Sequence, residues 1–132
     1  MCLVINKRVK LPKVQKDGYC IGYKVISNMN DSVYQVHQYT IGLNRSTRMD
    51  KRFDEYEVYN NRIERGFHIF LRLRTATDKM YRGISRYRKL IKVFFKPEDV
   101  VALGTWQLKN SSHNVVVTKM FIKSLDHICK GE

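Results

Sequence analysis

Short segments rich in β-branched and aromatic residues, separated by turn-forming residues, run through much of the chain. The strongest is 115–122, where three consecutive valines lead into a Met-Phe-Ile run. Segments of this length and composition are typical of strands that are bounded by turns. The chain is therefore predicted to build its core from a sheet of short strands.

Further stretches fit the same description: 1–5, 19–26, 33–43, 90–95 and 100–106. The polar residues between 19–26 and 33–43 predict an antiparallel hairpin, in which Gly42 ends the second strand. Pro97 predicts a turn before the strand at 100–106, and Gly104 predicts a bulge within that strand.

Residues 66–74 show the clearest alternation of apolar and polar side chains. A period of two predicts a strand that buries one face and points Arg72 and Arg74 to the other. A helix competes for the part from Phe70 onward, because Leu and Arg are good helix formers. A short helix is predicted over 79–89, after N-cap candidates at 75–78.

These elements amount to six or seven short strands and one or two short helices, an α+β fold dominated by an antiparallel sheet. The length of 132 residues predicts a single domain over 1–132. Residues 6–18 are polar and basic and read as a loop or arm. Residues 44–61 are charged, and they form either an ordered excursion or a mobile loop.

The positive charge is concentrated in sequence. The formal net charge is +13, and residues 62–96 hold eleven basic residues against two acidic ones, a local charge of +9. Arginine carries a planar fork that matches phosphate oxygens, so this window predicts an anion-binding surface. Its alternative role is a solvated face that keeps the protein soluble. The predicted contacts are Arg62, Arg65, His68, Arg72, Arg74, Arg82, Arg86, Arg88, Lys89 and Lys92.

His68 is the one member that is not a permanent cation. On the predicted strand it shares a face with Arg72 and Arg74, where it donates to a phosphate or stacks on a base. The alternative is a half-buried histidine that bonds to the backbone. Aromatic residues interleave with the window, a combination that single-stranded nucleic acids use, although core packing accounts for rings of this kind equally well. These residues are Tyr81, Tyr87, Phe94 and Phe95.

No catalytic or metal-binding constellation is present in the sequence. Glycine-rich phosphate loops, an HExxH pair and a nucleophile elbow are all missing. The three cysteines form no CxxC pair, which disfavours a zinc site or a disulfide framework. The acid pairs Asp54–Glu55 and Glu98–Asp99 are expected to be solvated or to cap turns. A protein that is not an enzyme, with no cofactor and no metal, is therefore expected.

Several short segments, taken in order along the chain, resemble small accessory proteins of phages and large DNA viruses. They are Met1-Cys2-Leu3, Tyr23-Lys24-Val25, Tyr39-Thr40-Ile41-Gly42, Gly66-Phe67-His68-Ile69-Phe70, Lys92-Val93-Phe94, Val100-Val101-Ala102 and the run 116–122. The resemblance implies a compact, strand-rich accessory protein and carries no activity with it.

The expected partner is an anion, with the phosphates of a nucleic acid as the first choice. Two alternatives stay open: a small phosphorylated nucleotide sequestered as a counter to host defence, or an acidic surface of a host protein. The longest apolar runs are too short to cross a membrane, and no apolar signal region follows the basic N-terminus. A place in the cytoplasm, or inside a host cell, is expected.

Overall fold

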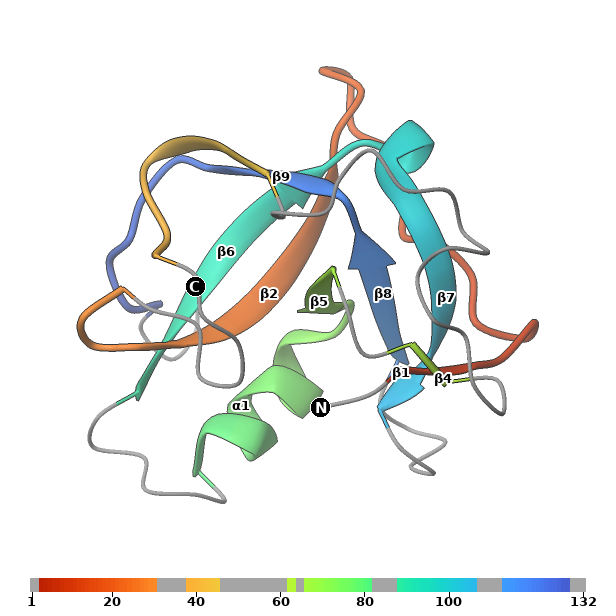
Figure 1. Ribbon diagram of the computed structural model, residues 1–132, viewed down its shortest axis with the longest axis horizontal. Coiled ribbons are helices and arrows are strands. Elements are labelled where there is room, and N and C mark those ends of the chain that lie inside the picture. The colour runs from red at the N-terminus through yellow and green to blue at the C-terminus, as the bar shows by residue number, and fades with distance from the viewer. Residues whose placement is uncertain are drawn as a thin grey trace.

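A computed structural model describes residues 3–30, 38–45, 62–63, 66–81, 88–106 and 113–128. Within them lie nine strands in one antiparallel sheet, one α-helix and one 3-10 turn (Figure 1). The elements are β1 (Leu3–Ile5), β2 (Cys20–Ser27), β3 (Gly42–Arg45), β4 (Arg62–Ile63), β5 (Phe67–Phe70), α1 (Leu73–Tyr81), β6 (Arg88–Phe95), η3 (Pro97–Asp99), β7 (Val100–Trp106), β8 (His113–Val117) and β9 (Lys119–Ile122). The predicted antiparallel α+β fold is confirmed, with more strands than the six or seven expected.

The sheet is rolled around its own core. Its strand order is β3-β9-β6-β2-β5-β8-β7-β1-β4, and Thr118 is the single residue between β8 and β9. The path from β9 through β6, β2 and β5 therefore returns to its start at β8. Figure 1 shows β9 continuing from β8 across the top of the molecule towards β6. The single strand predicted over 115–122 is thus two strands that serve opposite sides of the ring.

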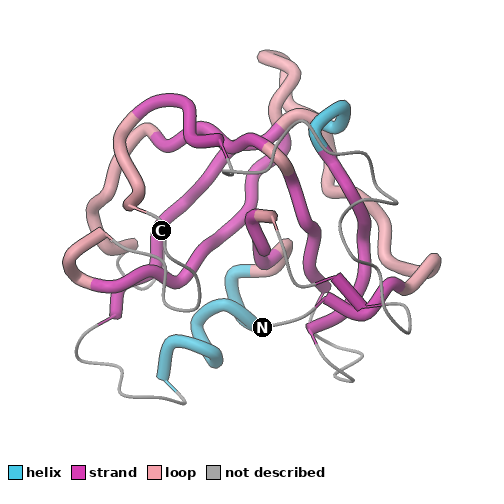
Figure 2. Tube along the Cα trace, viewed as in Figure 1, coloured by secondary structure: helices cyan, strands magenta, loops and turns pink. Residues whose placement is uncertain are grey.

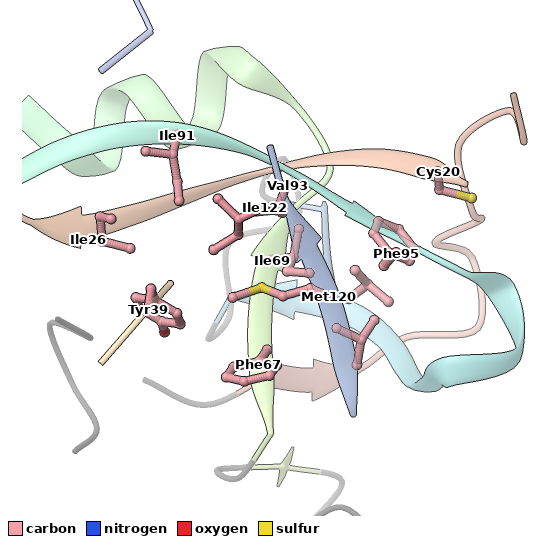
Figure 3. Packing of buried hydrophobic residues seen from close by; sticks show 12 residues of the cluster. Cys20, Ile26, Tyr39, Phe67, Ile69, Ile91, Val93, Phe95, Met120 and Ile122 are labelled. Carbon is pink, nitrogen blue, oxygen red and sulfur yellow. The ribbon is translucent and has the colours of Figure 1, made fainter. Parts of the chain in front are cut away.

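The core fills the space inside this ring. In β2, Cys20, Gly22, Lys24 and Ile26 are buried, while the residues between them are half-exposed. Period-two alternation sends these four to the inner face. Inner residues of the other strands meet them there, among them Ile69, Val93 and Ile122 (Figure 3). Tyr39, which precedes β3, lies at the edge of the same cluster and is 2% exposed.

The helix α1 covers part of the outer face of the ring (Figure 2). Leu73 and Ala76 pack against Phe70 of β5 and Leu90 of β6. The predicted helix over 79–89 is displaced: α1 begins earlier, at Leu73, and includes 79–81, whereas Arg88 and Lys89 belong to β6 and residues 82–87 lie outside the described residues. The helix starts early because Leu73 and Ala76 fall on one face and bury apolar surface there.

The strand predicted over 66–74 is correspondingly too long, since β5 ends at Phe70. The competing helical interpretation of the residues after Phe70 holds from Leu73 onward. Arg72 and Arg74 therefore do not share a strand face with His68.

The hairpin predicted between 19–26 and 33–43 does not form at the residues described from 38 onward. There β3 pairs with β9, while β2 pairs with β6 along its length and with β5 at Tyr23. Gly42 begins β3 rather than ending a strand, and its φ of 109° belongs to a turn. The side chain of Asn44 holds that turn through hydrogen bonds with Thr40 and Gly42. Residues 31–37 lie outside the described residues.

The bulge predicted at Gly104 lies elsewhere in β7. The register against β8 shifts between Val100 and Ala102, whereas Gly104 keeps its partners in β1 and β8. Gly104 instead allows a close approach of strands, because a Cβ there would overlap the carbonyl group of Val4.

The segment between β1 and β2 is fixed at two points. Val9 is buried and Leu11 packs on the core, whereas the five cations of this segment are exposed: Lys7, Arg8, Lys10, Lys13 and Lys16. The charged stretch at 46–61 lies outside the described residues. In the described parts of the chain, no helix has the length and apolar character to cross a membrane.

Candidate nucleic-acid interface

The arginine-rich window does not form one continuous element. Arg72 lies just before α1 and Arg74 lies in its first turn, and both are exposed. Arg88 and Lys89 begin β6 and point to opposite faces, as neighbours in a strand do. Lys92 lies further along β6 and is exposed. Arg65, Arg82, Arg86 and the side chain of Arg62 lie outside the described residues.

His68 is buried rather than presented to solvent. It is 4% exposed, and its Nδ1 lies 3.2 Å from the carbonyl oxygen of Gly66. Its strand partner is Val116, which belongs to a small apolar cluster with Leu3 and Ala102. This placement matches the alternative of a histidine bonded to the backbone. A phosphate could contact the His68 imidazole only if the surrounding strands separated.

A different group of side chains gathers on the outer face of β3, β9, β6 and β2. The register places Leu43 opposite Phe121, Phe121 opposite Phe94, and Phe94 opposite Ile21. Residues directly opposite one another in antiparallel strands share a face. Leu43, Phe121, Phe94 and Ile21 therefore form one apolar row across four strands, about 14 Å long at the usual strand spacing.

Cations lie on both sides of this row. Residues two positions along each strand return to the same face, so Lys92 and Lys96 flank Phe94, while Lys119 and Lys123 flank Phe121. Arg45 pairs with Lys119 and extends one flank towards the sheet edge. We call the following set the sheet-face site: the row Leu43, Phe121, Phe94 and Ile21, the ring of Tyr19, and the cations Arg45, Lys92, Lys96, Lys119 and Lys123.

The lysines and rings of the sheet-face site are in direct contact. The amine of Lys123 lies 4.3 Å from the ring centroid of Phe94, and that of Lys96 lies 5.4 Å from the centroid of Tyr19. The rings of Tyr19 and Phe121 are 6.3 Å apart and tilted by 52°. Phe94 is only 8% exposed, so Tyr19 and Phe121, both half-buried, present the accessible ring surface.

A hollow of about 180 Å³ opens beside the rings of Tyr19 and Phe121. Leu43, Lys96 and Lys119 line it together with two acids of the η3 turn, Glu98 and Asp99. Glu98 is exposed and its carboxylate lies 3.9 Å from the amine of Lys96. Asp99 is half-buried, and its backbone is fixed because its N–H donates to Lys96 and its carbonyl accepts from the N–H of Thr118.

Of the ten predicted contacts, Lys92 is the one that the described structure brings to the sheet-face site. The sequence nevertheless contains a signal for the rest. The pattern Lys-x-Phe-x-Lys occurs at 92–96 and again at 119–123, in two segments that pair with Phe opposite Phe. The second copy lies outside the arginine-rich window, so the density of charge along the sequence does not mark it.

No family model matches the chain, and neither the curated proteins nor the solved structures give a match. Among the described residues, no group of three His, Cys, Asp or Glu side chains is placed to hold a metal ion.

Proposed function

We propose that this protein binds single-stranded nucleic acid on the sheet-face site, without catalysing a reaction. The observation that carries the proposal is the pairing of the two Lys-x-Phe-x-Lys segments, which surrounds two phenylalanines with four lysines on one sheet face. Proteins that bind single strands combine a positively charged track for the phosphates with aromatic rings on which bases stack.

The aromatic component favours a single strand over a duplex. A ring stacks only on a base that is unpaired and turned out, whereas a duplex hides its base faces. In the described residues the face is made of strands and is bounded beyond Lys92 by α1, which packs on Tyr23, Val25 and Leu90. It is a broad surface on which a flexible strand can lie.

The size of the hollow favours a polymer over a free nucleotide. Sites that enclose small molecules usually measure about 300 to 1,000 Å³. The hollow at Tyr19 is smaller, about 180 Å³, and it opens onto the row of apolar side chains. A single base fits this volume while the rest of its strand stays on the outer surface.

The proposal is tested by the salt dependence of binding to a fluorescein-labelled twelve-nucleotide oligothymidylate, followed by fluorescence anisotropy. Each phosphate neutralised on a single strand contributes about −0.7 to the slope of log K against log salt. Replacing both Lys119 and Lys123 by glutamine is expected to make the slope shallower by about 1.4 and to weaken binding.

The matched control is the double variant with Arg72→Gln and Arg74→Gln. It removes the same charge from exposed positions off the row. We expect it to bind nearly as the wild type does. The proposal fails if the wild type binds with no salt dependence. Equal losses in the two double variants would indicate a diffuse basic surface, and a loss confined to the arginine variant would return the site to the arginine-rich window.

A further inference from the structure

Two acidic residues line the hollow, on a surface that otherwise attracts phosphates. Glu98 and Asp99 line it together with Lys96 and Lys119, and a carboxylate at this position repels any phosphate that comes close. The part of a nucleic acid that enters the hollow is therefore expected to be a base and not a phosphate. Tyr19 and Phe121 supply ring faces for that base, and the lysines at the rim hold the phosphates outside.

A carboxylate also selects among bases, because it accepts hydrogen bonds and donates none. Guanine presents two neighbouring N–H donors on its Watson–Crick edge, which match the two oxygens of a carboxylate. Adenine and cytosine each place an amino donor beside an acceptor nitrogen. Thymine and uracil place one N–H between two carbonyl oxygens, and those oxygens are repelled by a carboxylate. Edge contacts of this kind are how proteins read unpaired bases.

Asp99 is the better placed of the two acids. It is half-buried, and hydrogen bonds to Lys96 and Thr118 hold its backbone in place. Glu98 has a side chain that is 73% exposed and is near Lys96. A short side chain on a held backbone loses less conformational freedom on binding than a long, exposed one.

Resting on the proposed function, we infer that the hollow beside Tyr19 and Phe121 is a base pocket that prefers guanine, with the Asp99 carboxylate as the acceptor for the guanine N–H groups. The preference is for one guanine within a strand that the lysines hold. Guanine has the same edge in DNA and RNA, so the pocket reads the base in either polymer.

The test compares twelve-nucleotide oligothymidylate with the same strand carrying one central guanine, adenine or cytosine, by competition in anisotropy. A single guanine per strand avoids guanine quadruplexes. We expect the guanine strand to bind about tenfold more tightly than oligothymidylate, the order expected for a good bidentate contact with a base. A parallel series in oligouridylate RNA shows which polymer gains more.

The variants separate Asp99 from a general effect of charge. Asp99→Asn is expected to remove the guanine preference while binding to oligothymidylate is kept or slightly strengthened. Glu98→Gln removes the same charge from the neighbouring residue and is expected to keep the preference for guanine. If oligothymidylate binds but guanine gives no gain, the pocket inference fails and the proposed function stands. If Asp99→Asn keeps the full preference, the assignment to Asp99 is overturned. If oligothymidylate does not bind at all, the proposed function itself has failed.

Discussion

The amine of Lys24 lies 2.8 Å from the carbonyl oxygen of His68 and donates a hydrogen bond to it inside the ring of strands. Lys24 is 7% exposed, and its amine also lies 5.6 Å from the ring centroid of Tyr39. Strands β2 and β5 pair at Tyr23 and Phe70. Beyond that pair, the bond from Lys24 to His68 links the two strands. One side chain thus replaces part of a strand ladder.

Lys24→Met is expected to lower the free energy of unfolding by about 1.5 to 3 kcal/mol, the usual worth of a hydrogen bond to a charged group. Methionine keeps most of the packing volume but cannot donate to His68. Urea unfolding measures the change, and Lys10→Met, at an exposed position, serves as the control. If the Lys24→Met variant is as stable as the wild type, burying the ammonium costs as much as its bond contributes.

Phe121→Leu tests the aromatic part of the sheet-face site. Leucine keeps the apolar contact with Leu43 and Phe94 but removes the ring on which a base stacks. Stacking is worth about 1 to 3 kcal/mol per base, so affinity for the oligothymidylate should fall by between about fivefold and about 140-fold. Phe67→Leu, in the core, should lower the thermal unfolding temperature and leave the affinity unchanged. Equal affinities of wild type and Phe121→Leu would remove stacking from the proposal.

The sequence predicts correctly those strands whose own residues strongly favour β structure. β2, β6 and β7 follow from their β-branched and aromatic residues, and Pro97 marks the turn between β6 and β7. The segment after Phe70 is ambiguous in sequence. Leu71 and Leu73 continue the period of two that predicts a strand, while Leu73 and Ala76 also fit one face of a helix. Packing against Leu90, a partner distant in sequence, settles that choice. Tertiary contacts override weak local preference in this way.

The sheet-face site depends on information that no local pattern holds. The two Lys-x-Phe-x-Lys segments are visible in the sequence, but their value comes from the register that sets Phe94 opposite Phe121. Thr118 separates β8 from β9, which lie on opposite sides of the ring of strands. A one-residue slip of β9 against β6 would turn Phe121 and its flanking lysines into the core while Phe94 stayed on the outer face.

Asn44→Asp is expected to disturb the edge of the sheet-face site. The Asn44 side chain accepts a hydrogen bond from the Thr40 N–H at 3.1 Å and donates to the carbonyls of Thr40 and Gly42 at 2.8 and 3.1 Å. Aspartate keeps the first bond but sets a buried carboxylate against two carbonyl oxygens. We expect a loss of about 1 to 3 kcal/mol in stability. Hydrogen exchange at the amides of β3 should rise more than at those of β2, and uniform exchange would contradict this local role.

Gly104→Ala is expected to be more destabilising than Gly22→Ala. A Cβ at Gly104 meets the backbone carbonyl of Val4, which cannot move without shifting β1. A Cβ at Gly22 meets first the side chain of Ile69, which has other rotamers. Overpacking costs about 1 to 3 kcal/mol, so Gly104→Ala should reach the upper part of that range. Thermal unfolding of both variants gives the order, and the reverse order would show that the Ile69 contact is the more rigid.

Cys20 should resist alkylation in the folded protein and should make stability depend on pH. Its side chain is fully buried, its Sγ lies 3.8 Å from the carbonyl oxygen of Pro12, and burial raises the pKa of the thiol above its ordinary value of 9.0. The reactive thiolate is therefore scarce at neutral pH. Iodoacetamide treatment followed by peptide mass mapping should find Cys20 unmodified until the protein unfolds.

The raised pKa of the Cys20 thiol also means that the unfolded chain loses this proton at a lower pH than the folded protein does. The stability that the thiol contributes is then present below pH 9.0 and is lost above it, so wild type should lose stability relative to Cys20→Ala as pH rises from about 8 to about 10. Parallel pH profiles for the two proteins would contradict the burial of this thiol.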